Sequence, residues 1–172
     1  TEYALSPDNR YVIFVAGGML HRRDLYISGN VIFHYTQLAN QTPVTYPVWS
    51  PDGSEILFTA SSQIARVAID GSDYSVIYDN PTDYPHQSMV AWSPDGSQIA
   101  SLYATSPGSE HRGLLVMYRD GTNVREIISA GDALISNPQW LADGQQIAVL
   151  QRDSADADVM IAIYDLEGTL VS

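Results

Sequence analysis

Short runs of consecutive apolar residues recur along this chain, and each follows a turn rich in Pro, Asp and Gly. The clearest copy is Trp-Ser-Pro-Asp-Gly at residues 49–53, followed by Ile-Leu-Phe at 56–58. The same five residues return at 92–96, before Ile99 and Ala100. Altered copies stand at 5–9 and 140–144, before apolar runs at 12–15 and 147–150. The chain is therefore a tandem array.

The hydrophobic pattern within each copy predicts β-strands that are buried on both faces. Apolar residues occupy successive positions at 12–15 and 147–150, whereas a strand with one solvated face would alternate apolar and polar residues. The four turn aspartates, Asp8, Asp52, Asp95 and Asp143, follow one another at 44, 43 and 48 residues. This spacing is typical of four-stranded propeller blades, and no amphipathic period of 3.6 indicates helical repeats. We predict an all-β chain, a β-propeller of four antiparallel blades.

The turn signals set the predicted blades at about residues 2–40, 46–80, 88–130 and 137–172, within a single propeller domain or a fragment of one. In the first blade we expect strands ending at Leu5 and covering 11–16, 24–28 and 31–37, with a loop at 17–23 and a Gly29-Asn30 hairpin turn. The later blades repeat this plan, with strands at 48–49, 55–60, 64–69 and 74–78; at 89–92, 98–103, 114–118 and 124–128; and at 138–140, 146–150, 159–164 and 169–172.

Charge and composition exclude several function classes. The formal net charge is −12, and all eight basic residues are Arg. Nucleic acids and anionic membranes attract basic proteins, so we expect neither partner. The absence of Lys and Cys excludes Schiff-base and thiol chemistry and phosphate loops that depend on Lys. No apolar run is long enough for membrane insertion as a helix, and we expect no cofactor.

The repeat resembles that of TolB-type β-propellers: Trp-Ser-Pro-Asp-Gly, an apolar strand, then a strand closing on Asp-Gly. Residues 47–71 and 90–121 carry this resemblance best. It implies an extracytoplasmic protein, periplasmic or secreted, that is a non-enzymatic scaffold for a protein, peptide or glycan. The alternative is the propeller portion of a prolyl-oligopeptidase-like serine peptidase with its catalytic domain elsewhere. No Gly-x-Ser-x-Gly motif occurs here, so we expect no enzymatic activity from these residues.

Topology indicates a binding face for such a partner. In a four-stranded meander, the second-to-third and blade-to-blade connections share one end, and here they are the longer ones. Binding residues concentrate in long loops on rigid scaffolds. The candidate binding residues on this long-loop face are His21, Arg22, Arg23, Tyr46, Tyr84, His86, His111 and Arg112.

Three other features allow both a structural and a functional interpretation. The turn aspartates are expected to cap backbone turns rather than to form a catalytic ring. The recurring Trp49, Trp92 and Trp140 are expected to pack between blades. Asp153, Asp156 and Asp158 are weak calcium candidates in what is otherwise a plain acidic loop, and no other metal site is predicted. The number of blades also stays open among a fragment of a larger ring, a homodimer and a closed four-bladed ring.

Overall fold

The computed structural model describes residues 3–28, 32–35, 43–60, 63–79, 86–105, 113–129, 131, 133–154 and 156–172. The chain divides into two compact units, Thr1–Asp79 and Asn80–Ser172, and each is described by itself. The described residues form strands and turns, and none of their segments is a helix able to cross a membrane. The prediction of an all-β chain is confirmed.

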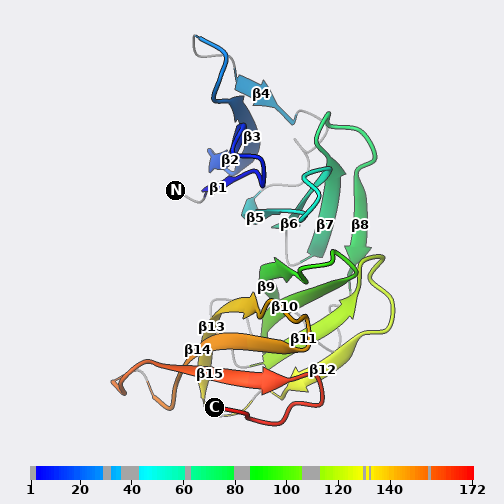
Figure 1. Cartoon of the computed structure of the whole chain (residues 1–172). Coiled ribbons are helices and arrows are strands. Elements are labelled where there is room, and N and C mark those ends of the chain that lie inside the picture. The colour runs from blue at the N-terminus through cyan, green and yellow to red at the C-terminus, as the bar shows by residue number, and fades with distance from the viewer. Residues whose placement is uncertain are drawn as a thin grey trace. The chain divides into compact units, whose positions relative to one another are not determined.

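The first unit contains two four-stranded antiparallel meanders (Figure 1). In both sheets the strand order follows the chain, so each strand pairs with its sequence neighbours. The first sheet comprises β1 (Tyr3–Leu5), β2 (Tyr11–Ala16), β3 (Met19–Asp24) and β4 (Ile32–His34); the second comprises β5 (Val44–Trp49), β6 (Glu55–Ala60), β7 (Gln63–Ala68) and β8 (Ser75–Tyr78).

The second unit repeats this plan with a shorter final sheet. Its four-stranded sheet comprises β9 (His86–Trp92), β10 (Gln98–Ala104), β11 (Gly113–Tyr118) and β12 (Arg125–Ile128); its three-stranded sheet comprises β13 (Leu134–Trp140), β14 (Gln146–Arg152) and β15 (Met160–Asp165). Leu170 then forms an isolated antiparallel bridge with Tyr164, so the last residues begin to pair with β15.

Burial along the second strand is nearly complete in the two middle sheets, whereas only Ile13 of β2 and only Ile147 and Val149 of β14 are fully buried. In β6 the residues Ile56–Ala60 are all buried, and in β10 the same holds for residues 99–104. One core cluster in the first unit joins Ile13 of β2 to Phe58 of β6. In the second unit a corresponding cluster joins Leu102 of β10 to Val149 of β14. Packing against the neighbouring sheet of the same unit therefore covers the apolar residues of these second strands.

The first strands of three sheets are longer than predicted because each contains a β-bulge. Tyr46, Met89 and Asn137 have φ values of 51°, 43° and 51°, and each stands three residues before its Trp. The pairing register shifts at each of these positions. A bulge places two residues opposite one, which lets the strand continue past the point where pairing would otherwise end.

The first sheet corrects two sequence predictions. Residues 17–23 are not a loop: Gly17 and Gly18 form a tight turn with φ values of 59° and 77°, and β3 begins at Met19. The predicted strand at 24–28 is also wrong, because β3 ends at Asp24 and Leu25–Ser28 are bends. A two-residue turn suffices here because glycine accepts positive φ without steric cost. The predicted Gly29-Asn30 turn lies outside the described residues.

Candidate functional site

The Pro-Asp turns are held by hydrogen bonds within each repeat. The Ser50 hydroxyl donates to Asp52 at 2.6 Å, and the same oxygen accepts the Glu55 N–H at 3.0 Å. Ser6 with Asp8, and Ser93 with Asp95, repeat this arrangement at 2.6 Å. The hydroxyl of Ser93 and the N–H of Ser97 lower the pKa of Asp95 to about 2. These carboxylates therefore cap turns, as predicted.

Two of the recurring Trp residues join adjacent sheets within a unit. Trp49 Nε1 donates to the Ala4 carbonyl on β1 at 3.2 Å, and Trp140 Nε1 donates to the Ala91 carbonyl on β9 at 3.2 Å. Trp92 is also buried, and its ring lies 5.7 Å from the Arg119 guanidinium carbon. Packing of Trp49 and Trp140 between blades is therefore confirmed.

Three predicted binding residues lie on strand β3 rather than in a loop. Arg22 points into the interface between the first two sheets, where Nη1 donates to the Ile69 carbonyl at 2.7 Å. Its guanidinium also lies over the rings of Tyr11 and Phe33. His21 is buried and Arg23 is exposed. Arg22 thus contributes to packing between blades.

The other predicted binding residues divide between strands and segments outside the described residues. Tyr46 is the bulge residue of β5, and His86 opens β9, so neither lies in a loop. The positions of Tyr84, His111 and Arg112 lie outside the described residues. The long-loop face as a binding surface therefore stays a prediction.

The calcium hypothesis has no support from the described acidic loop. Asp153, Asp156 and Asp158 are all exposed. Among the described residues, no group of three or more His, Asp or Glu side chains comes together so as to hold a metal ion.

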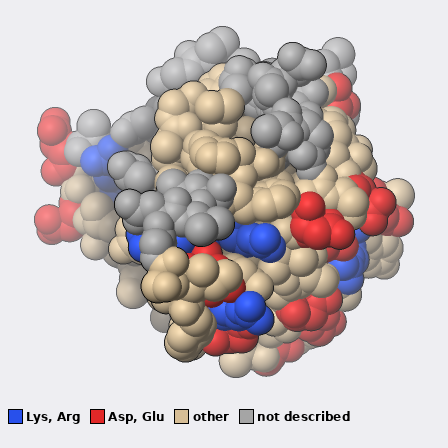
Figure 2. All heavy atoms as spheres, turned by 90° about the horizontal axis from the view of Figure 1, so that it is seen from above, with Lys and Arg blue, Asp and Glu red and all other residues tan. Residues whose placement is uncertain are grey.

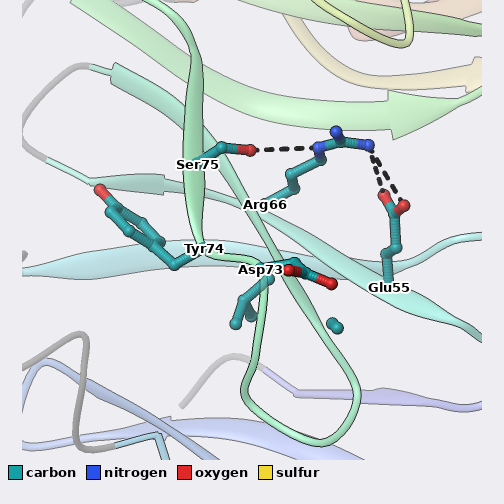
Figure 3. Close-up of a pocket in the computed structure, with 7 residues that line it drawn as sticks. Glu55, Arg66, Asp73, Tyr74 and Ser75 are labelled. Atoms are coloured by element: carbon teal, nitrogen blue, oxygen red, sulfur yellow. Dashed lines mark hydrogen bonds and ion pairs between the residues drawn. The ribbon is translucent and has the colours of Figure 1, made fainter.

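A recess on the second sheet gathers polar side chains that are not among the binding residues predicted from the sequence. It has a volume of about 400 Å³ and is lined by Glu55, Arg66, Val67, Ala68, Asp73, Tyr74 and Ser75. Arg66 Nη1 lies 3.2 Å from one Glu55 carboxylate oxygen, and its Nε donates to the Ser75 hydroxyl at 3.2 Å. Figure 3 shows Arg66 extended between these two partners. The recess thus holds a fixed guanidinium.

Strand register explains how these residues meet. Arg66 of β7 pairs with Ser75 of β8, and Glu55 opens β6 beside the last residue of β7, Ala68. The recess therefore lies at the end of the blade that carries the short turns, opposite to the long-loop face. The available signal was Arg66 itself, because a charged residue inside the apolar run 64–67 requires a partner.

The rim of the recess carries a free negative charge. Asp73 is exposed, has a φ of 52°, and its carboxylate has no hydrogen-bond or ion-pair partner among the described residues. In Figure 3 the Tyr74 ring points away from the ion pair, and its packing against Phe58 agrees with this. The three charged side chains of the recess, Glu55, Arg66 and Asp73, sum to one negative charge. The recess therefore favours a positively charged group.

The chain as a whole also carries more negative than positive charge. The chain carries 20 acidic and eight basic residues. In the view of Figure 2, acidic groups recur with Arg side chains interspersed among them. A surface of this composition attracts cationic partners over neutral or anionic ones.

Comparison with solved structures identifies the fold as that of a β-propeller of the TolB type. TolB from Acinetobacter baumannii matches 98% of this chain at a TM-score of 0.76 and 19% identity. A putative TolB from Agrobacterium tumefaciens matches 98% of the chain at a TM-score of 0.64 and 17% identity. The chain covers 41% of the first structure and 78% of the second. The predicted TolB-like propeller repeats are confirmed at the level of fold.

The sequence comparisons add one relative. An uncharacterized protein of Agrobacterium fabrum is 31% identical over 118 residues, which is 61% of this chain. The chain spans about two fifths of that relative, since the match covers 39% of its length. No protein-family model matches the chain.

Proposed function

We propose that this chain is a non-enzymatic binding scaffold that acts outside the cytoplasm and holds a basic segment of a protein or peptide partner in the recess on its second sheet. The observation that carries this proposal is the arrangement of Arg66, which Glu55 and Ser75 fix in place beside the unpaired carboxylate of Asp73. The resemblance to TolB-type propellers supports the extracytoplasmic location.

The recess suits binding of a peptide-like ligand because its polar groups are complementary to a peptide. Asp73 can accept hydrogen bonds from a Lys or Arg side chain, and charge-assisted hydrogen bonds are the stronger kind. The Arg66 guanidinium is held by partners on both sides, so little side-chain freedom is lost when a ligand binds. The sheet beneath the recess holds these polar groups in place.

The scaffold interpretation also agrees with the turn chemistry. The aspartates that recur along the chain accept hydrogen bonds from their own turns, as Asp52 does from Ser50 and Ser54. These aspartates therefore stabilise the turns of the fold. One solved structure named above is TolB and the other is a putative TolB, which favours a scaffold over the propeller of a peptidase.

The test is a binding titration with fluorescent peptides that carry three Arg, three Glu or only neutral residues in one Gly-Ser background. We expect the Arg peptide to bind most tightly and to weaken as salt is added, because the attraction is between exposed charges. Asp73→Asn should weaken it several-fold. The matched control is Asn123→Asp, since Asn123 has a φ of 53° and occupies the corresponding turn of the third sheet.

Two results would overturn the proposal. One is equal affinity for the Arg and Glu peptides. The other is a preference for Arg that Asp73→Asn leaves intact, since the charge that selects the ligand would then lie elsewhere. Glu55→Gln with Arg66→Gln provides a second variant, which removes the ion pair without leaving one charge unpaired.

A further inference from the structure

Two histidines face each other across β3 and β4. His21 pairs with His34 in the strand register, and their Nδ1 atoms lie 2.8 Å apart. The two rings are nearly perpendicular, with centroids 4.8 Å apart. The turn network, the interface between the first two sheets and the recess on the second sheet do not use this pair.

The surroundings of His21 fix which nitrogen carries its proton. His21 Nε2 lies 3.2 Å from the Ala16 carbonyl oxygen. Only a protonated ring nitrogen can donate a hydrogen bond to a carbonyl oxygen. In the neutral ring, Nδ1 therefore presents its lone pair toward His34. His21 is 7% exposed and its ring stacks on Phe14. The ring is thus held in one orientation, whereas His34 is exposed and can adjust.

This arrangement matches the usual surroundings of a metal-binding histidine. Such a residue donates its second ring N–H to a backbone carbonyl or carboxylate, which fixes the tautomer and the ring orientation. Two imidazole nitrogens at ~2.0 Å from one ion lie about 2.8 Å apart when the angle between them is near 90°. Tetragonal geometry of that kind is typical of Cu²⁺ and Ni²⁺, and Cu²⁺ binds more tightly.

We propose that His21 and His34 form a two-histidine site for a divalent transition-metal ion, with Cu²⁺ preferred, and that water completes the coordination. The described residues supply no third carboxylate or imidazole ligand there. Arg23 is exposed two residues along β3, on the same side of the sheet as His21, and its charge opposes a cation. This site is independent of the proposed recess.

The test is a Cu²⁺ titration of the whole chain, purified without a histidine tag, followed by calorimetry and electron paramagnetic resonance. We expect one tight site whose spectrum shows two imidazole nitrogens. His34→Ala should weaken Cu²⁺ affinity at least about tenfold, since even loss of a supporting contact commonly costs that much. His34→Gln, which keeps a polar side chain, should also lose the second nitrogen from the spectrum.

The control variant is His86→Ala with His111→Ala, which removes the chain's other two histidines and should leave the site intact. Circular dichroism checks that each variant folds. Unchanged affinity in His34→Ala would overturn the proposal, as would a spectrum with one imidazole nitrogen or none. Either result would make the pair a hydrogen-bonded structural contact.

Discussion

The two units each contain one interface between adjacent sheets, and these interfaces share one contact but differ in another. Near the first strands they are alike: Trp49 donates to Ala4, and Trp140 donates to Ala91, at 3.2 Å in both cases. Near the third strands they differ. In the first unit Arg22 and Tyr35 both donate to the Ile69 carbonyl. In the second unit Arg125 donates to the Leu166 carbonyl at 3.4 Å.

The second unit adds a close backbone approach where the first relies on side chains. A Cβ atom on Gly168 would lie 2.3 Å from the Ile127 carbonyl oxygen. The Trp contact is therefore part of the repeat itself, whereas the contact near the third strands is specific to each interface. This explains why the repeat sequence predicts the Trp contact but does not predict the contact near the third strands.

The largest expected effect comes from removing the shared contact. Trp49→Ala should lower the free energy of unfolding of its unit by about 3–5 kcal/mol, because a buried aromatic side chain is replaced by a cavity. Trp140→Ala should cost less, since Trp140 is only partly buried. Urea denaturation followed by circular dichroism measures both. An equal cost would contradict the view that burial, rather than the hydrogen bond, dominates.

Substitutions at two glycines distinguish the cost of a positive φ from the cost of a close backbone contact. Gly168 and Gly53 both have positive φ, 84° and 71°, but a Cβ on Gly53 would meet only Pro7 Cδ at 3.7 Å. Gly53→Ala should therefore cost about 1 kcal/mol, the penalty for positive φ alone. Gly168→Ala should cost about 2–3 kcal/mol, because the Ile127 carbonyl must also move. Similar denaturation midpoints for the two variants would show that no close approach exists.

The hydrogen bonds near the third strands should contribute to stability in the order that their lengths predict. Arg22→Met should cost about 1.5 kcal/mol, since it removes a 2.7 Å hydrogen bond from a charged donor. Arg125→Met should cost about 0.5 kcal/mol, because its hydrogen bonds are 3.4 and 3.5 Å long. Adding Tyr35→Phe to Arg22→Met should cost more than the sum of the two, as the Ile69 carbonyl then loses both partners. Additive costs would indicate that water replaces them.

The smallest effect concerns acid stability. The pKa of Asp95 is lowered to about 2 by hydrogen bonds from Ser93 and Ser97. A depressed folded-state pKa contributes stability above the unfolded value of about 3.8, and this is lost as pH falls toward about 2. Ser93→Ala should raise the Asp95 pKa in a carboxyl-carbon NMR titration. An Asp95 that titrates near its ordinary value in the unmodified chain would contradict the turn network.

The elements that could be predicted from the sequence are those whose signal is local. The strands at 11–16 and 55–60 were predicted with the bounds that β2 and β6 have. Both follow a Pro-Asp turn, and both are apolar on successive residues, so the start and the length of each strand are encoded nearby. Burial matches the apolar run in β6, whereas in β2 only Ile13 is fully buried. The capping role of Asp52 was predictable for the same reason.

The remaining features depend on contacts distant in sequence. Strand β3 was missed because His21, Arg22 and Arg23 look like a polar loop, and the partly buried Arg22 is explained by its hydrogen bond to the Ile69 carbonyl of the next sheet. The bulges at Tyr46 and Met89 were missed because neither residue type signals positive φ. The recess was missed because Glu55, Arg66 and Ser75 are brought together by strand register.

The central claim is that a Trp side chain holds the two sheets of each unit together. Its indole N–H donates a hydrogen bond to the first strand of the other sheet in that unit. Hydrogen exchange of the indole Nε1–H groups, followed by NMR, tests this most directly. The account predicts slow exchange for Trp49 and Trp140, with Trp49 becoming fast when Ile13→Ala weakens the core of its unit. Exchange of both indoles at the rate of a solvated Trp in the folded chain would contradict the account.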